Sequence, residues 1–424
     1  MKRLLSSIKH TPMLLALLFI ALFFFPAAIV APPESVSNSI VTAVGIDKRD
    51  EEFAVSMLTY LSYPNQTYTD NYEVFTATGK TLGEALTKAG LQVGKNISLF
   101  HTHAAIISGK MLEEDIAPSL DYLVRVASLP QSCVLIGTNV SSKEFLEFIQ
   151  KLDKQLDITL EELTFYNSNY VFWNDTTIDA FLTDYHSPTR SSLMSYLPLV
   201  DGDINGIPIE GGSDQASGGG TGGSGGGGNS SDSTSPSPAQ TKSAKQLVND
   251  GSMLIIKDGK KTRIIPREIL RGINWFNTNT TGAVLMLDDV SDEKFDSAQL
   301  VYRVNKKQIR KLLEFENGHP VLTMNVRAFV NLTEVNGEKE DLTKVREASY
   351  VSDVVRQKIE ELIKKQIYSA LQILIEDNAD ILDLYNEFYR AHRGETRKFT
   401  NEMEDKNDFL KEIIMKVVVT VLPN

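Results

Sequence analysis

MLLALLFIALFFFPAAIVA, residues 13–31, is an apolar run without a single charged side chain. A helix rises about 1.5 Å per residue, so this run would span roughly 28 Å, close to the hydrocarbon core of a bilayer. Lys2, Arg3 and Lys9 precede the run, whereas the first acidic residue after it is Glu34. Positive charge tends to stay on the cytoplasmic side of an apolar segment. The pattern predicts that the rest of the chain folds on the outer side of a membrane.

The leader, residues 1–31, is either a retained anchor or a cleaved signal peptide. Ala31, with Ile29 two positions before it, is the best candidate for a small-residue cleavage site, but Pro32 would follow the cut. We therefore predict an uncleaved anchor, and a soluble secreted protein is the alternative. The segment has no cysteine nearby, which rules out lipidation of a new N-terminal cysteine.

Composition limits the classes of protein to which the chain can belong. The 424 residues are 42% hydrophobic, which is enough for two or three buried cores. The net charge is −12, and without the three positive residues of the leader it is −15, so the exported part should repel nucleic acid. Cys133 is the only cysteine, which excludes an intrachain disulfide and a cysteine metal cage. An exported protein of this kind fits a Gram-positive envelope.

Residues 38–200 predict an N-terminal α/β domain with a mixed sheet. Alternating β-branched residues in 38–61 predict a hairpin, and short apolar runs predict further strands at 99–108 and 132–138. Two T/S-x-x-E pairs, Thr81 with Glu84 and Ser141 with Glu144, predict the starts of helices. Residues 201–247 follow as a Gly/Ser-rich linker that cannot bury apolar surface. It joins two domains or forms a disordered loop within one.

Residues 248–424 predict a C-terminal α+β domain, which could divide into subdomains at 248–290 and 291–424. A hairpin turns at Asp258-Gly259, a short helix follows Pro266, and separate strands are expected at 281–287, 298–307, 309–318 and 320–335. Helices are expected at 351–376 and 379–391, and 412–422 reads as a strand central in its sheet. The fold class is α+β, with several domains of mixed sheets flanked by helices and an N-terminal membrane-anchor helix.

Motifs for catalysis, cofactors and metals are weak or incomplete. Gly79-Lys80-Thr81 resembles the end of a phosphate loop, but Val74 stands where that motif needs glycine. His101 and His103 alternate, as metal ligands on a strand can, but packing explains them better. Cys133 lies in an apolar run and is expected to be buried. We assign no catalytic, cofactor-binding or metal-binding residue and predict a protein that is not an enzyme.

Several stretches in order resemble the Ger(x)C family, the C subunits of bacterial spore germinant receptors. They are VTAVGID (41–47), TATGKTLGEAL (76–86), LFHTHAAIISG (99–109), the helix and proline-containing passage at 177–200, GSMLIIKDGK (251–260) and ILRGINWF (269–276). The resemblance covers nearly all of residues 38–424. Two features differ from the family: its lipobox cysteine is missing, and the glycine-rich insertion is longer.

The resemblance implies a non-enzymatic receptor subunit on the outer face of the spore inner membrane. It would act in spore germination beside two membrane-embedded partners, the germinant receptor A and B subunits, without binding nucleic acid. Arg271, Gly272 and Trp275 of the R-G-x-x-W stretch are candidate partner contacts. The structural alternative is that Trp275 belongs to the core and Gly272 to a packing contact.

Two other functions compete with this interpretation. A surface ligand-binding module or adhesin would need an exposed aromatic cleft, but the aromatic residues are scattered along strand and helix stripes. An envelope hydrolase is the third hypothesis, because carboxylate hydrolases carry no local signature. The acidic pairs Asp288-Asp289 and Glu338/Glu340 have turn-like surroundings and are expected to be solvent-exposed.

Overall fold

The computed structural model describes residues 38–61, 72–94, 96–156, 160, 176–201, 207–208, 245–277, 283–336 and 349–424. Both the predicted anchor, 13–31, and the glycine-rich run lie outside these residues. Within the described ranges, no helix combines the length and the apolar content needed to cross a bilayer.

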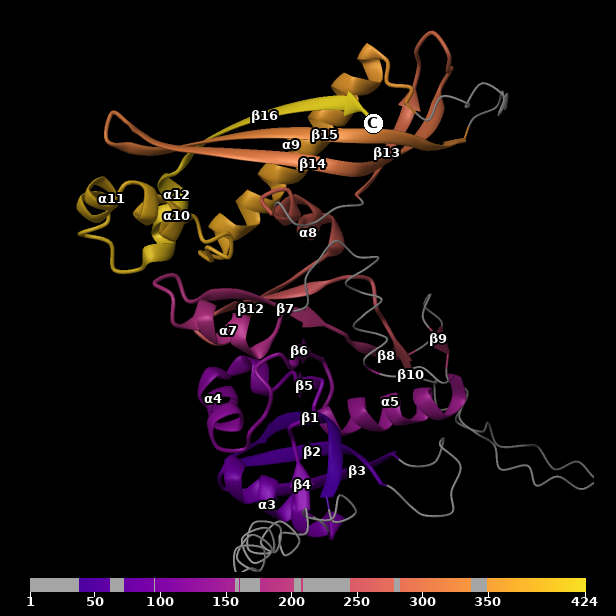
Figure 1. The fold of residues 1–424 in the computed structure, drawn as a ribbon, viewed down its shortest axis with the longest axis vertical. Coiled ribbons are helices and arrows are strands. Elements are labelled where there is room, and N and C mark those ends of the chain that lie inside the picture. Colours follow the sequence, from indigo (N-terminus) through magenta and orange to yellow (C-terminus); the bar gives the residue numbers. More distant parts are fainter. Residues whose placement is uncertain are drawn as a thin grey trace, which may run out of the picture.

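A nine-stranded mixed sheet forms the lower half of the molecule (Figure 1). The strand order is β12-β11-β7-β6-β5-β1-β2-β3, with β4 paired to β1. Strands β4, β5, β6 and β7 extend the sheet from β1 by parallel pairing, while β2, β3, β11 and β12 add antiparallel strands. The bounds are β1 Asn38–Arg49, β2 Glu52–Tyr60, β3 Tyr72–Gly79, β4 Asn96–Ser98, β5 Ala104–Ile107, β6 Val134–Gly137, β7 Ser191–Tyr196, β11 Met253–Lys257 and β12 Lys260–Ile265.

Helices cover both faces of this sheet. Helices α3 (Leu82–Val93), α4 (Ala117–Arg125) and α7 (Ile178–Tyr185) bury their apolar residues in one core. Helix α5 (Ser142–Leu156) packs against the opposite face and buries Phe145, Ile149 and Leu152 in a second core. Because both faces are covered, all four residues of β5 are buried. The predicted mixed sheet is confirmed.

The β11–β12 hairpin links the two halves of the protein. Its turn, Asp258-Gly259, has positive φ at both residues (50° and 77°), as a type I′ turn requires. Strand β11 pairs with β7, so its backbone belongs to the first sheet. Met253 and Ile255, however, pack into the C-terminal core, while Leu254 and Ile256 pack into the N-terminal core. A division of the chain at residue 248 therefore stays a proposal.

The ends of the predicted linker, 201–247, contain short strands. Strands β8 (Leu199–Asp201), β9 (Ile207–Pro208) and β10 (Lys245–Leu247) form a three-stranded sheet in the order β8-β10-β9. Gln246 and Leu247 of β10 are buried. At its C-terminal end, therefore, the segment buries two side chains, and the rest of the predicted linker stays a prediction.

A four-stranded sheet in the order β13-β14-β15-β16 forms the top of the molecule (Figure 1). Its strands are β13 Val284–Val290, β14 Ala298–Glu316, β15 His319–Asn336 and β16 Ile414–Pro423. The long helix α9 (Asp353–Glu376) packs on one face, and its predicted apolar stripe, including Ile359, Ile363 and Ile367, is buried there. Helix α8 (Arg267–Asn274) packs beside α9, while α10 (Leu384–Ala391), α11 (Arg393–Phe399) and α12 (Phe409–Glu412) cluster at one end of the sheet.

Three predictions about the C-terminal elements were wrong. Residues 298–307 and 309–318 form one strand, β14, because a bulge between Val304 and Lys306 shifts the register without ending the pairing. Strand β16 is an edge strand and not a central one. Two backbone groups on the free edge of β16 form hydrogen bonds with side chains of α9. Val421 N donates to Glu360 (3.2 Å), and Tyr368 Oη donates to the Met415 carbonyl (3.4 Å). The helix expected at 379–391 begins only at Leu384.

Candidate functional site

The family-like motifs of the N-terminal half are occupied by structural contacts. A Cβ at Gly45 would lie 2.3 Å from Ser142 Cβ, so only glycine lets the start of α5 approach β1. The buried Asp47 carboxylate accepts the Ser142 backbone N–H at 3.0 and 3.1 Å, which caps α5. VGID therefore serves to join a strand to a helix.

The TATGKT motif also has a structural role, because it begins helix α3. Thr81 Oγ1 accepts the Glu84 N–H at 3.2 Å, and Glu84 Oε2 accepts the Lys80 N–H at 2.9 Å. A Cβ at Gly79 would lie 2.6 Å from Ala85 N. These contacts confirm the predicted helix start and use the motif's backbone groups for capping. The second predicted start is confirmed by Glu144 N donating to Ser141 Oγ at 3.2 Å.

Gly272 and Trp275, two of the candidate partner contacts, lie between α8 and α9. A Cβ at Gly272 would lie 2.1 Å from the Gln366 carbonyl oxygen and 2.6 Å from Ala370 Cβ. Trp275 is 4% exposed, and its indole Nε1 donates to Gln366 Oε1 at 2.9 Å. Both residues thus hold the two helices together within this chain.

Arg271, the third candidate, is half-buried on α8 beside Arg267. In the described part of the chain, the Nε atoms of both side chains are buried without a hydrogen-bond partner. Burial, with the positive charge of Arg267, lowers the pKa of Arg271. Of the three predicted residues, Arg271 is therefore the one whose side chain is partly exposed and has no hydrogen-bond partner among the described residues.

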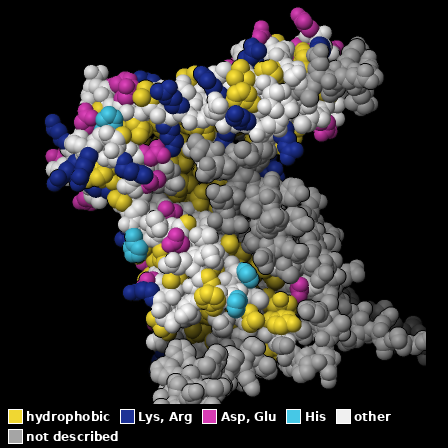
Figure 2. Space-filling model, viewed as in Figure 1, with side chains coloured by type: hydrophobic (Ala, Val, Ile, Leu, Met, Phe, Trp, Pro, Cys, Tyr) yellow, Lys and Arg dark blue, Asp and Glu magenta, His cyan; other side chains and the backbone are white. Residues whose placement is uncertain are grey.

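A cleft of about 550 Å³ separates the C-terminal sheet from the lower half of the molecule. Leu270, Ile273 and Phe276 of the α8 segment form one wall, and Leu193 and Met253 of the first sheet lie opposite. Figure 2 shows hydrophobic side chains in this hollow between the two halves. Pockets of this size at domain interfaces are common ligand sites. No sequence motif indicated this cleft, because its walls come from segments far apart in the chain.

A network of hydrogen bonds, also missed by sequence reasoning, joins the two halves. Asn407 Nδ2 donates to the Thr189 carbonyl at 2.7 Å, and Asn407 Oδ1 accepts from Ser191 Oγ at 2.9 Å and from Asp380 N at 2.7 Å. Lys257 pairs with Asp405 at 2.5 Å beside it. We call these contacts the junction.

Asp380 of the junction is fully buried. Its carboxylate accepts the N–H groups of Leu384 and Tyr385 at 3.1 and 2.8 Å, so it begins helix α10. Burial raises the pKa of Asp380 to about 6, and these two hydrogen bonds oppose the rise. Across the junction, burial likewise raises the pKa of Asp184 to about 6.

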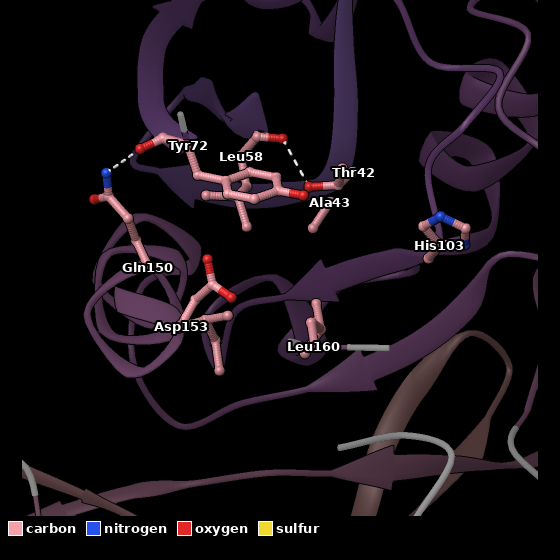
Figure 3. A pocket seen from close by; sticks show the side chains of 9 residues that line it. Thr42, Ala43, Leu58, Tyr72, His103, Gln150, Asp153 and Leu160 are labelled. Carbon is pink, nitrogen blue, oxygen red and sulfur yellow. Dashed lines mark hydrogen bonds between the residues drawn. The ribbon is translucent and has the colours of Figure 1, made fainter. Parts of the chain in front are cut away.

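A smaller cavity of about 110 Å³ lies against β1, β2 and α5 (Figure 3). Tyr72, His103, Gln150 and Asp153 provide polar groups around an apolar floor that includes Leu58. Gln150 donates to the Tyr72 carbonyl, and Thr42 Oγ1 donates to the Leu58 carbonyl at 3.2 Å. The space suits a few atoms at most.

The titratable residues considered for chemistry do not assemble into a reactive group. His101 and His103 precede strand β5, and both are exposed. Within the described residues, no three His, Cys, Asp or Glu side chains are arranged to hold a metal. Cys133 is buried, as predicted, and burial raises the pKa of its thiol to about 12, which keeps it protonated.

Comparison with known proteins gives two family matches. Residues 36–199 match the family described as spore germination protein N-terminal domain, and residues 250–422 match the family described as spore germination B3/GerAC like, C-terminal. No curated protein matches the chain. The crystal structure of the GerBC protein is similar over 90% of this chain and 96% of that one, with 12% sequence identity and a TM-score of 0.47.

The two family matches together cover most of the chain, and they divide it where the glycine-rich segment interrupts it. The order of motifs that indicated the family from sequence is thereby confirmed. The chain belongs to the Ger(x)C family of spore germination proteins, the membrane-associated C subunits of germinant receptors.

Proposed function

We propose that this protein is a non-enzymatic subunit of a nutrient-germinant receptor, tethered to the outer face of the spore inner membrane by residues 13–31. It acts beside the two membrane-embedded A and B subunits, and its folded body is a rigid docking unit. The apolar run is long enough to span a bilayer, and its flanking charges favour this orientation.

The main observation behind the non-enzymatic role is what the family motifs do in the fold. Gly45, Asp47, Thr81, Gly272 and Trp275 serve close packing, helix capping and buried hydrogen bonds. Catalytic motifs instead present a nucleophile, an acid or a base to a cleft. Motifs used for packing and capping support a body whose task is to hold a shape.

Arg271 is the residue that we propose for contact with a receptor partner. Its side chain is half-buried, lies next to a second cation and forms no ion pair with another described residue. A carboxylate from a partner subunit would pair with this cation and offset the repulsion from Arg267. Gly272 and Trp275 would contribute indirectly, by fixing α8 on α9.

Deleting the gene and restoring it with variants tests this proposal. Spores without the chain should lose the response to the nutrient of their receptor, and the full chain should restore it. Arg271→Glu should reduce co-purification with the A and B subunits, whereas Arg397→Glu, on the exposed surface of α11, should not. Unchanged germination to every nutrient in a strain without paralogues would contradict a receptor role, and equal co-purification of both variants would remove Arg271 from the contact.

A further inference from the structure

Strand β14 carries the sequence NKKQIRK over residues 305–311, and its cations alternate between the two faces of the C-terminal sheet. The inward cations have partners within the chain. Lys307 Nζ donates to the Asn274 carbonyl at 2.6 Å, and Lys311 Nζ pairs with Glu387 at 2.6 Å.

In the part of the chain that the structure describes, the outward cations have no carboxylate or carbonyl partner of this kind, although Lys306 Nζ lies over the Phe329 ring at 5.7 Å from its centroid. Lys306 and Arg310 are exposed, and so are Arg303 earlier on β14 and Arg327 on the neighbouring β15. Among the described residues, none of these four side chains forms an ion pair with a carboxylate. We call this set of Arg303, Lys306, Arg310 and Arg327 the basic face.

Strand register places the four cations close together. Arg327 is opposite Gln308, Lys306 is opposite Phe329, and Arg310 is opposite Asn325. Arg327 is therefore the diagonal neighbour of both Lys306 and Arg310, at about 7–8 Å on an antiparallel sheet. Like charges at this spacing repel one another, so carboxylates brought to the face from outside would be stabilised there.

The basic face lies on the open side of the sheet. Helix α9 packs on the other side (Figure 1), and Figure 2 shows lysine and arginine side chains gathered along the top of the molecule, over this sheet. Acidic residues on the open side lie toward both ends of the sheet: Glu316 pairs with Lys416 at 2.9 Å near the hairpin tip, and Asp288 and Glu334 accept hydrogen bonds from Gln299 and Asn336 at 2.7 and 3.0 Å near the other end. The middle of the face thus concentrates positive charge on a chain whose net charge is −12.

We propose that the basic face is a docking surface for an acidic protein partner. A protein fits the mixed character of the surface, because Leu312 and Val418, which are 44% and 49% exposed, lie on the same side as the cations. Protein interfaces combine apolar contacts with arginine in this way.

A membrane surface and a nucleic acid fit this face less well. Each is an extended polyanion, which would meet the negative charge of the whole chain as well as the local cations. An acidic patch on a protein is smaller, and at physiological salt charges farther away than about 8 Å are largely screened from it. Charge complementarity therefore favours a local cluster of Asp and Glu side chains.

Binding of defined probes to the full chain in non-ionic detergent micelles tests the proposal. The probes are a fluorescein-labelled 20-residue peptide rich in glutamate and leucine, vesicles containing phosphatidylglycerol, and a 20-nucleotide single-stranded DNA. The test variant is Arg310→Glu/Arg327→Glu. The control, Arg397→Glu/Lys398→Glu, changes the net charge equally at exposed positions of α11. Arg310→Gln/Arg327→Gln is a second test variant, in case the first does not fold.

We expect the test variants to weaken peptide binding at least tenfold and the control to change it less than twofold. In spores, the test variants should slow germination at an unchanged level of membrane-bound protein, and the control should not. The proposal is overturned if the unmodified chain does not bind the peptide, or if test and control variants weaken binding equally. Tighter binding to vesicles or DNA, lost in the test variants, would assign the face to that ligand and overturn the protein assignment.

Discussion

The two large sheets differ in how many faces they bury. The N-terminal sheet has helices on both sides, and a strand such as β5 is buried at every residue. The C-terminal sheet has α9 on one side, so β14 alternates between core residues, such as Tyr302, and exposed ones, such as Arg310. Coverage explains the difference in sequence period, because a strand with one wet face alternates and a fully covered one does not. The open face is the side of this sheet that we propose for docking.

Replacement of Gly272 by alanine is expected to give the largest loss of stability, because it disturbs the helix packing on the covered face of the C-terminal sheet. The new Cβ would lie 2.1 Å from the Gln366 carbonyl oxygen, so α8 must move away from α9. Overpacking of this kind should cost about 3 kcal/mol. Urea unfolding of the full chain in micelles measures the loss.

Gly394→Ala is the matched control, since no atom lies within 4 Å of its added Cβ and the residue is in helix α11. Helix propensity should make this variant more stable by up to about 1 kcal/mol. An unchanged free energy of unfolding for Gly272→Ala would mean that the close contact between α8 and α9 does not stabilise the protein.

Asn407→Ala should have the next largest effect, because it removes the side chain that links both sheets. The Asp380 N–H would lose its partner in a buried site, whereas the Thr189 carbonyl would keep the Ser191 hydroxyl at 2.9 Å. One unsatisfied buried donor should cost about 2 kcal/mol in the free energy of unfolding. If the two halves then melt in separate transitions, the junction is what couples them. An unchanged single transition would place that coupling in β11 instead.

Lys307→Met and Lys306→Met should give the smallest effects, and they compare the two faces of β14 directly. Burial lowers the pKa of Lys307 to about 8 from 10.5. Between these values the unfolded chain holds a proton that the folded chain has released, so the stability of the folded chain rises with pH. From pH 7.5 to 9 this gain should be about 1 kcal/mol, at 1.36 kcal/mol per pKa unit.

Lys307→Met should lose this rise of stability with pH, and the exposed Lys306→Met should keep it. Urea unfolding at the two pH values gives the slope for each variant. Equal slopes for the two variants would show that burial does not lower the pKa of Lys307. The two faces of β14 would then not differ in this respect.

Much of the local structure could be predicted because it depends on neighbours in sequence. The T-x-x-E and S-x-x-E pairs began helices as expected, since capping needs residues only three positions apart. Asp258-Gly259 specified its turn, and the apolar stripe of α9 matched the helical period. Of the candidate site, the sequence indicated Arg271, Gly272 and Trp275, and its structural alternative, with Trp275 in the core and Gly272 at a packing contact, is what the structure shows.

The sequence by itself determined much of the secondary structure, the family and a leader with the composition of a membrane anchor. Only the tertiary structure decided that β16 is an edge strand, that Gly272 seats α8 on α9, and that Asn407 joins residues more than 200 positions away. It also decided which lysines of β14 point into the chain and donate a hydrogen bond there, and which face solvent. The reason is physical: capping and periodicity depend on bonds over a few residues, whereas exposure depends on what long-range packing brings to each face.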